Sequence, residues 1–269
     1  MDRSSAMSSS VLCILVLLAS TDALHIAAHG GGFSTHGGGF SYCGGTMRGR
    51  RTRRCTALAP SGIDGYPLAT QAALFSATFL GISSAAYASA TTYERLRPPR
   101  VALTTRVWDY WESFSAVLLG CVFLTAGRSH FMVPEAFEAI YPPQGTWGFW
   151  VLPGDAKFHV AWTGVAEVLG GAGLLTGGIL NVLGPERRST GGLLRASARC
   201  VALLVFCVTP ANFYMLSHGA TMPGVLEGPL PMSWHAGRFV AQASILSVLF
   251  TLGLARSPTD TVLDTQTDE

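Results

Sequence analysis

Four long apolar segments in the C-terminal two-thirds of the chain constrain its fold more than any other feature. They cover residues 114–133, 158–183, 194–217 and 238–255. Each approaches the ~20 residues that a helix needs to cross about 30 Å of hydrocarbon. Because the apolar runs are continuous and a bilayer admits only helices or closed barrels, they predict helices. We expect an all-α fold, a transmembrane four-helix bundle with room for one extra N-terminal helix.

The composition fits a protein whose main partner is the lipid bilayer. Only 13% of the residues are charged, against about a quarter in ordinary soluble domains. The sequence has no long basic stripe, so no nucleic-acid partner is expected. It also has no C-x-x-C motif, and Cys121, Cys200 and Cys207 lie in apolar segments. There cysteine behaves as a small hydrophobe, so no metal site is predicted.

The N-terminal region has the character of a targeting sequence. An apolar run at 11–19 follows Arg3 and precedes small residues, which predicts a signal peptide over 1–23. Residues 24–63 lack acidic side chains and carry five arginines between 48 and 54, as a disordered transit-peptide-like leader would. The two together resemble the bipartite presequence of algae with secondary plastids. They predict a plastid membrane, thylakoid or envelope, as the location.

Residues 64–107 form a linker whose role stays open at this stage. The stretch 68–90 is uncharged and long enough to span a bilayer, which allows an extra helix. It is also rich in small residues and ends in Ala-Ser-Ala before Thr91, which fits a second sorting signal that is removed. The membrane domain is expected at 108–257, and 258–269 is expected to be a disordered tail.

The arginines are unevenly distributed, which predicts an orientation. They precede the first apolar segment, separate the second from the third and follow the fourth: Arg95, Arg97, Arg100, Arg106, Arg187, Arg188, Arg195 and Arg256. By the positive-inside rule these positions share one side of the membrane, which in a plastid is the stromal side.

Glu167 is the most unusual residue of the apolar segments. It lies nine residues into the second segment, or ~13 Å along a helix, near the middle of the bilayer. A carboxylate there is costly and usually faces the bundle interior, where it marks a site or stabilises helix packing. Both interpretations stay open. Small residues around it would let a neighbouring helix approach closely: Gly164, Gly170, Gly173 and Gly177.

Five other polar residues lie on the remaining segments. His130 lies near the end of the first, and Asn212 and Tyr214 follow Pro210, which tends to kink a helix. Arg238 and Gln242 lie four residues apart and so share one face of the fourth. Each has a plain structural interpretation as a packing or hydrogen-bonding residue. We expect them to form one intramembrane polar pocket with Glu167, for which Arg238 is the natural counter-ion unless it binds an anionic ligand.

Four ordered motifs resemble the DoxX-like family of small four-helix membrane proteins. They are AGRSHF with IYPP (126–143), TGVAEVLGGAGLL (163–175), TPANFYM (209–215) and Arg238 with Gln242. The resemblance covers about 114–256, although Arg128 departs from the family's usual apolar or small polar residue. The family is named for a membrane subunit of an archaeal thiosulfate:quinone oxidoreductase, and most members are uncharacterised.

The resemblance implies a redox-associated, quinone-proximal membrane subunit with quinone as its cofactor. The sequence contains no haem, iron–sulfur or dinucleotide motif, so electrons would come through a redox partner protein or the quinone. Two alternatives stay open. One is a non-enzymatic assembly factor or anchor, and the other is a small-molecule or proton-coupled transporter that acts as a homodimer and titrates Glu167. Whether the chain is an enzyme is left open.

The leader prediction is tested by sequencing the N-terminus of the mature protein from its native membrane. We expect the residues before about 64 to be absent, because 1–63 has the character of targeting sequence. A first residue at Thr91 would identify 68–90 as a second sorting signal, and retention of residues 24–63 would contradict the leader.

Overall fold

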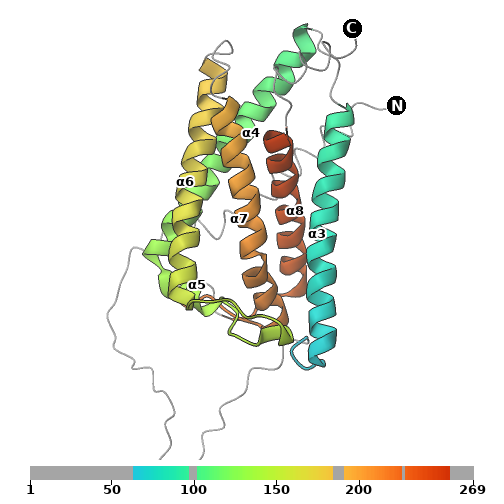
Figure 1. Cartoon of the computed structure of the whole chain (residues 1–269), viewed down its shortest axis with the longest axis vertical. Coiled ribbons are helices and arrows are strands. Elements are labelled where there is room, and N and C mark those ends of the chain that lie inside the picture. Colours follow the sequence, from blue (N-terminus) through green and yellow to red (C-terminus); the bar gives the residue numbers. More distant parts are fainter. Residues whose placement is uncertain (1–62, 97–101, 184–190, 226–227, 255–269) are drawn as a thin grey trace, which may run out of the picture.

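The computed structural model describes residues 63–96, 102–183, 191–225 and 228–254, and most of them are helical (Figure 1). The all-α class is therefore confirmed for this part of the chain. The predicted signal peptide, most of the transit-peptide-like leader and the C-terminal tail lie outside the described residues.

Five long helices make up the fold, and each is long and apolar enough to cross a membrane. They are α3 (Leu68–Leu96), α4 (Ala102–Met132), α6 (Ala156–Leu183), α7 (Gly191–His218) and α8 (Met232–Leu254). A short helix α5 (Pro134–Ala139) and a single 3-10 turn η1 (Thr146–Gly148) lie between α4 and α6. The four-helix count is not confirmed, because α3 is a fifth helix of the same kind.

The helices extend beyond the predicted apolar segments. The first segment was expected to begin at 114, whereas α4 begins at Ala102, and the fourth was expected at 238, whereas α8 begins at Met232. The added turns contain Trp108, Trp111 and Trp234. Tryptophan suits the boundary between hydrocarbon and headgroups, so these helices continue through a region that hydropathy alone does not mark.

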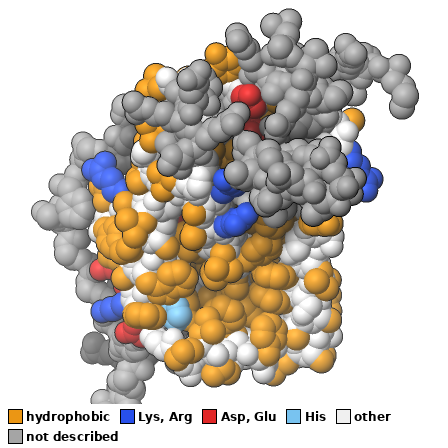
Figure 2. Space-filling view, turned by 45° about the horizontal axis from the view of Figure 1, so that its top comes forward, with side chains coloured by type: hydrophobic (Ala, Val, Ile, Leu, Met, Phe, Trp, Pro, Cys, Tyr) orange, Lys and Arg blue, Asp and Glu red, His pale blue; other side chains and the backbone are white. Residues whose placement is uncertain are grey.

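The helices pack side by side in the order α4, α6, α7, α8 and α3 (Figure 1). The buried apolar core lies mainly between α7, α8 and α3, and contains Ala86, Val201 and Leu246. The outer surface is also apolar: Figure 2 shows hydrophobic side chains over a broad face of the molecule. Leu80, Leu169 and Leu203 are more than 60% exposed. Such a surface is consistent with contact to a lipid bilayer.

Glycines bring α4 and α6 into close contact. Gly120 and Gly127 of α4, like Gly164, Gly171 and Gly178 of α6, recur every seven residues and so share one helix face. A Cβ atom on Gly120 would lie 2.6 Å from the backbone nitrogen of Leu175. There is no room for any side chain, so the two backbones touch directly.

The glycines expected to pack helices divide between two neighbours. Gly164 lies against His130 of α4. The other three lie against α7 in antiparallel register, in the pairs Gly170–Val201, Gly173–Ser197 and Gly177–Leu194. Pro210 lies inside α7, which continues past it to His218. Thus α6 is in close contact with a helix on each side.

Substitution of Gly120 by alanine should destabilise the bundle by about 1–3 kcal/mol, because the new Cβ forces α4 and α6 apart. Thermal unfolding of the detergent-solubilised protein measures the effect. The matched control is Gly81→Ala on α3, where nothing lies within 4 Å of the added Cβ. That variant should unfold at the wild-type temperature or slightly above it. Equal unfolding temperatures for the two variants would contradict the packing of α4 on α6.

Candidate functional site

His130 of α4 and Glu167 of α6 form a buried pair at this interface. The His130 Nε2 atom lies 3.4 Å from Glu167 Oε2. The two residues are only 7% and 6% exposed. Gly164 makes the pairing feasible, because a Cβ on it would lie 2.8 Å from the Cβ of His130. The close backbone contact therefore allows the imidazole to reach the carboxyl group.

The surroundings of His130 fix where its ring carries a proton. Its Nδ1 atom lies 3.0 Å from the carbonyl oxygen of Val160. A carbonyl oxygen only accepts, so Nδ1 carries the hydrogen. In the neutral ring Nε2 is then an acceptor, and it faces Glu167. Thr163 lies 3.4 Å from Nδ1, and Phe137 of α5 stacks on the ring with centroids 3.9 Å apart.

Glu167 is incompletely bonded. Within the described part of the chain, its Oε2 atom is buried and has no hydrogen-bond partner. The contact with His130 is close, but its geometry is not that of a hydrogen bond. A buried polar atom without a partner is rare and calls for an explanation, such as a water, an ion or a ligand that completes it.

A second polar group lies between α7 and α8. Gln242 Nε2 donates to Thr209 Oγ1 and to the Val205 carbonyl oxygen at 3.3 Å. Asn212 donates from Nδ2 to Gln242 Oε1 at 3.3 Å. Arg238 Nη1 donates to Asn212 Oδ1 at 3.3 Å and contacts Met215 Sδ at 2.8 Å. These bonds link two helices through groups that would otherwise be unsatisfied in lipid.

The polar residues that were expected to form one pocket instead form two separate groups, which lie at a similar level along the helix bundle. Among the described residues, Glu167 pairs with His130, while Arg238 bonds to Asn212 and Met215 and to no carboxylate. The register of α6 on α7 places Glu167 level with Val205, whose carbonyl oxygen accepts from Gln242. Tyr214 belongs to neither group.

Tyr214 instead lies against Trp147, a residue that the sequence analysis did not select. The two ring centroids are 6.4 Å apart. Trp147 is 1% exposed, and its Nε1 donates to Ser217 Oγ at 3.1 Å. Its φ of 55° lies in the left-handed region that non-glycine residues rarely adopt. Gly145 and Gly148 flank it with positive φ, so Gly-Thr-Trp-Gly was the available signal of a tight turn.

Comparison with known protein families finds a match to one family model in the helical domain. A family model described as a domain of unknown function (DUF8561) matches residues 119–251. The match begins within α4, ends within α8 and contains both polar groups, whereas α3 lies outside it. No curated protein and no solved structure matches the chain.

The division into two polar groups is tested with double-mutant cycles in detergent. We expect His130→Ala and Glu167→Gln to be coupled by about 0.5–3 kcal/mol in unfolding free energy, because the side chains are in contact. Glu167→Gln and Arg238→Ala share no partner, so their effects should add to within about 0.5 kcal/mol. Strong coupling between Glu167 and Arg238 would favour the single-pocket arrangement instead.

Proposed function

We propose that this chain is a redox-associated membrane subunit of the DoxX-like type, in which His130 and Glu167 form a quinone-proximal site. The observation that carries the proposal is the buried Glu167 Oε2 atom, which has no hydrogen-bond partner among the described residues and lies 3.4 Å from the imidazole. Intramembrane carboxylates are costly and commonly mark ligand sites or proton relays.

The residues around the pair suit a quinone. Its polar oxygen atoms would find hydrogen-bonding groups at Glu167, and its isoprenoid tail would lie on apolar side chains. Phe131 of α4 and Phe158 and Leu169 of α6 supply such a surface, since each is more than half exposed on the outer face. When bound, a quinone would supply two-electron, two-proton carrier chemistry, with the electrons coming from a partner protein.

The pair can be without net charge inside the bilayer. With Nδ1–H directed at Val160, the neutral His130 ring presents the Nε2 lone pair to Glu167. With a protonated Glu167 carboxyl group beside this neutral ring, the pair would carry no net charge. A neutral pair costs least in a bilayer. The same carboxyl group could direct its hydrogen at a ligand oxygen, which gives the pair a proton-donating role.

The resemblance in the four motifs supports the family assignment, and the leader supports a plastid membrane of an alga, thylakoid or envelope. The remaining requirement is a redox partner protein or a second copy of the chain. Neither an anchor nor an assembly factor needs an unsatisfied carboxyl oxygen at Glu167. A transporter needs a route across the bundle in addition to one titrating group.

The test measures quinone binding by the full-length protein in lipid nanodiscs. A short-chain ubiquinone is titrated in, and its binding is monitored by the quenching of tryptophan fluorescence. Wild type should bind saturably. Glu167→Gln should weaken binding about tenfold, because the ligand loses the hydrogen bond from the buried carboxyl group. Arg238→Ala should change the dissociation constant less, since Arg238 belongs to the other polar group.

The matched control is Glu135→Gln, which makes the same chemical change on an exposed carboxylate of α5. It should bind quinone like wild type. Unchanged binding by a normally accumulating Glu167→Gln variant would overturn the proposal. Loss of both Glu167→Gln and Arg238→Ala from the membrane would favour the anchor instead.

A further inference from the structure

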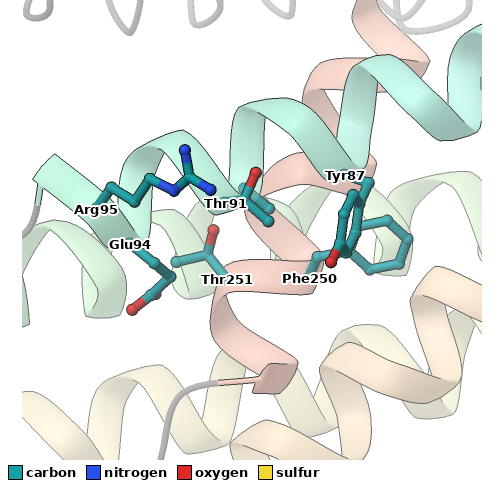
Figure 3. A pocket seen from close by; sticks show the side chains of 7 residues that line it. Tyr87, Thr91, Glu94, Arg95, Phe250 and Thr251 are labelled. Atoms are coloured by element: carbon teal, nitrogen blue, oxygen red, sulfur yellow. The ribbon is translucent and has the colours of Figure 1, made fainter.

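A cavity lies between α3 and α8, away from both polar groups (Figure 3). Its volume is about 250 Å³, and the described residues that line it come from these two helices: Tyr87, Ala90, Thr91, Glu94, Arg95, Phe250 and Thr251. The contributing segments are the C-terminal turns of α3 and α8, whereas His130 lies at the C-terminal end of α4, which runs in the opposite direction. The cavity and the His130–Glu167 pair thus lie toward opposite ends of the bundle.

The side chains that line the cavity change from aromatic at one end to charged at the other. Tyr87 and Phe250 both line one end, and Arg95 lies at the other, with its guanidinium group directed toward Thr91 (Figure 3). The change follows from the helix period, since Tyr87, Thr91 and Arg95 are each four residues apart and so share one face of α3. Glu94 lies beside Arg95 at this end, but only the guanidinium group of Arg95 is directed along the cavity, so the cavity is complementary to an amphiphile whose head is anionic.

Arg95 is available to bind such a head. It is exposed, and among the described residues it makes no hydrogen bond or ion pair. Figure 3 shows the neighbouring Glu94 carboxylate directed away from the guanidinium group. The two threonine hydroxyl groups donate to carbonyl oxygens of their own helices, Thr91 to Ala88 and Thr251 to Ser247. Recognition of an anion therefore falls to Arg95.

The size and the position of the cavity narrow the class of ligand. Pockets for drug-sized molecules measure about 300–1,000 Å³, so 250 Å³ suits one hydrocarbon chain better than a ring cofactor. Arg95 lines the cavity at the C-terminal end of α3, and Arg199 of α7 lies at the same end of the bundle, where its Nε donates to the Gly253 carbonyl oxygen at 2.8 Å. Basic residues at a membrane surface attract anionic lipids.

We propose that this cavity binds one acyl chain of an anionic lipid, with Arg95 on the headgroup and Tyr87 and Phe250 against the chain. Because α3 lies outside the matched residues 119–251, the α3 side of the site lies outside the matched domain, whereas Phe250 and Thr251 lie inside it. It is independent of the proposed quinone site. An occupied cavity would join α3 to α8 and so stabilise the fifth helix on the bundle.

The experiment measures lipid binding to the full-length protein by native mass spectrometry in a neutral detergent. Phosphatidylglycerol and phosphatidylcholine with identical acyl chains are compared, and sn-glycerol 3-phosphate serves as a headgroup without chains. Wild type should retain phosphatidylglycerol in preference to phosphatidylcholine and should not retain glycerol phosphate. Arg95→Gln should reduce the affinity for phosphatidylglycerol about fivefold, as expected for one arginine at a lipid surface.

Two further variants separate the headgroup from the chain. Arg128→Gln removes the same charge from an exposed residue near the opposite end of the bundle, and it should keep the wild-type preference. Tyr87→Ala should weaken both lipids alike, because it removes contact with the chain. Equal losses in Arg95→Gln and Arg128→Gln would overturn the proposal. Retention of glycerol phosphate as strong as that of the lipid would also overturn it, since the site would then bind a free anion.

Discussion

The direct contact between the backbones of α4 and α6 determines what the rest of the bundle can do. Neither helix could approach the other so closely with side chains at Gly120, Gly127, Gly164 and Gly171. The approach is what lets His130 reach Glu167 across the interface. Without it, Glu167 would be an isolated carboxyl group among hydrocarbon, which a membrane helix tolerates poorly. The same glycine contacts therefore account both for the close packing of the two helices and for the pairing of the polar side chains between them.

The α7–α8 interface also contains buried polar side chains, but neutral amide and hydroxyl groups satisfy most of their hydrogen bonds. There the helices are linked by amide and hydroxyl groups, with Gln242 bonded to Thr209, Val205 and Asn212. Each of these groups is neutral, and Arg238 is held by neutral acceptors. Such bonds restrict the rotation of one helix against the other. Among the described residues, the buried carboxyl–imidazole pair thus belongs to the α4–α6 interface, while an amide and hydroxyl network with Arg238 at one end joins α7 to α8.

Much of the fold could be predicted from the sequence, because hydrophobic length and the cost of buried charge are local properties. They identified the four core helices and singled out Glu167. The partner of Glu167 could not be predicted, because it depends on helix rotation and register, which no local pattern encodes. Charge alone favoured Arg238 as its counter-ion, whereas the glycine contacts of α6 on α4 bring His130 to it instead. The role of 68–90 was equally open, since a retained helix and a removed signal share one composition. Trp147 was missed because its burial depends on Phe75 of α3 and Phe213 of α7.

The fifth helix has a consequence for the topology of the whole chain. Because α3 and α8 run in the same direction, residues 63 and 254 lie at opposite ends of the bundle (Figure 1). If all five helices cross a membrane, as their length and hydropathy allow, the odd number of crossings puts residues 63 and 254 on opposite sides of it. If the predicted leader is removed, its five arginines between 48 and 54 do not oppose the usual charge bias of such an arrangement.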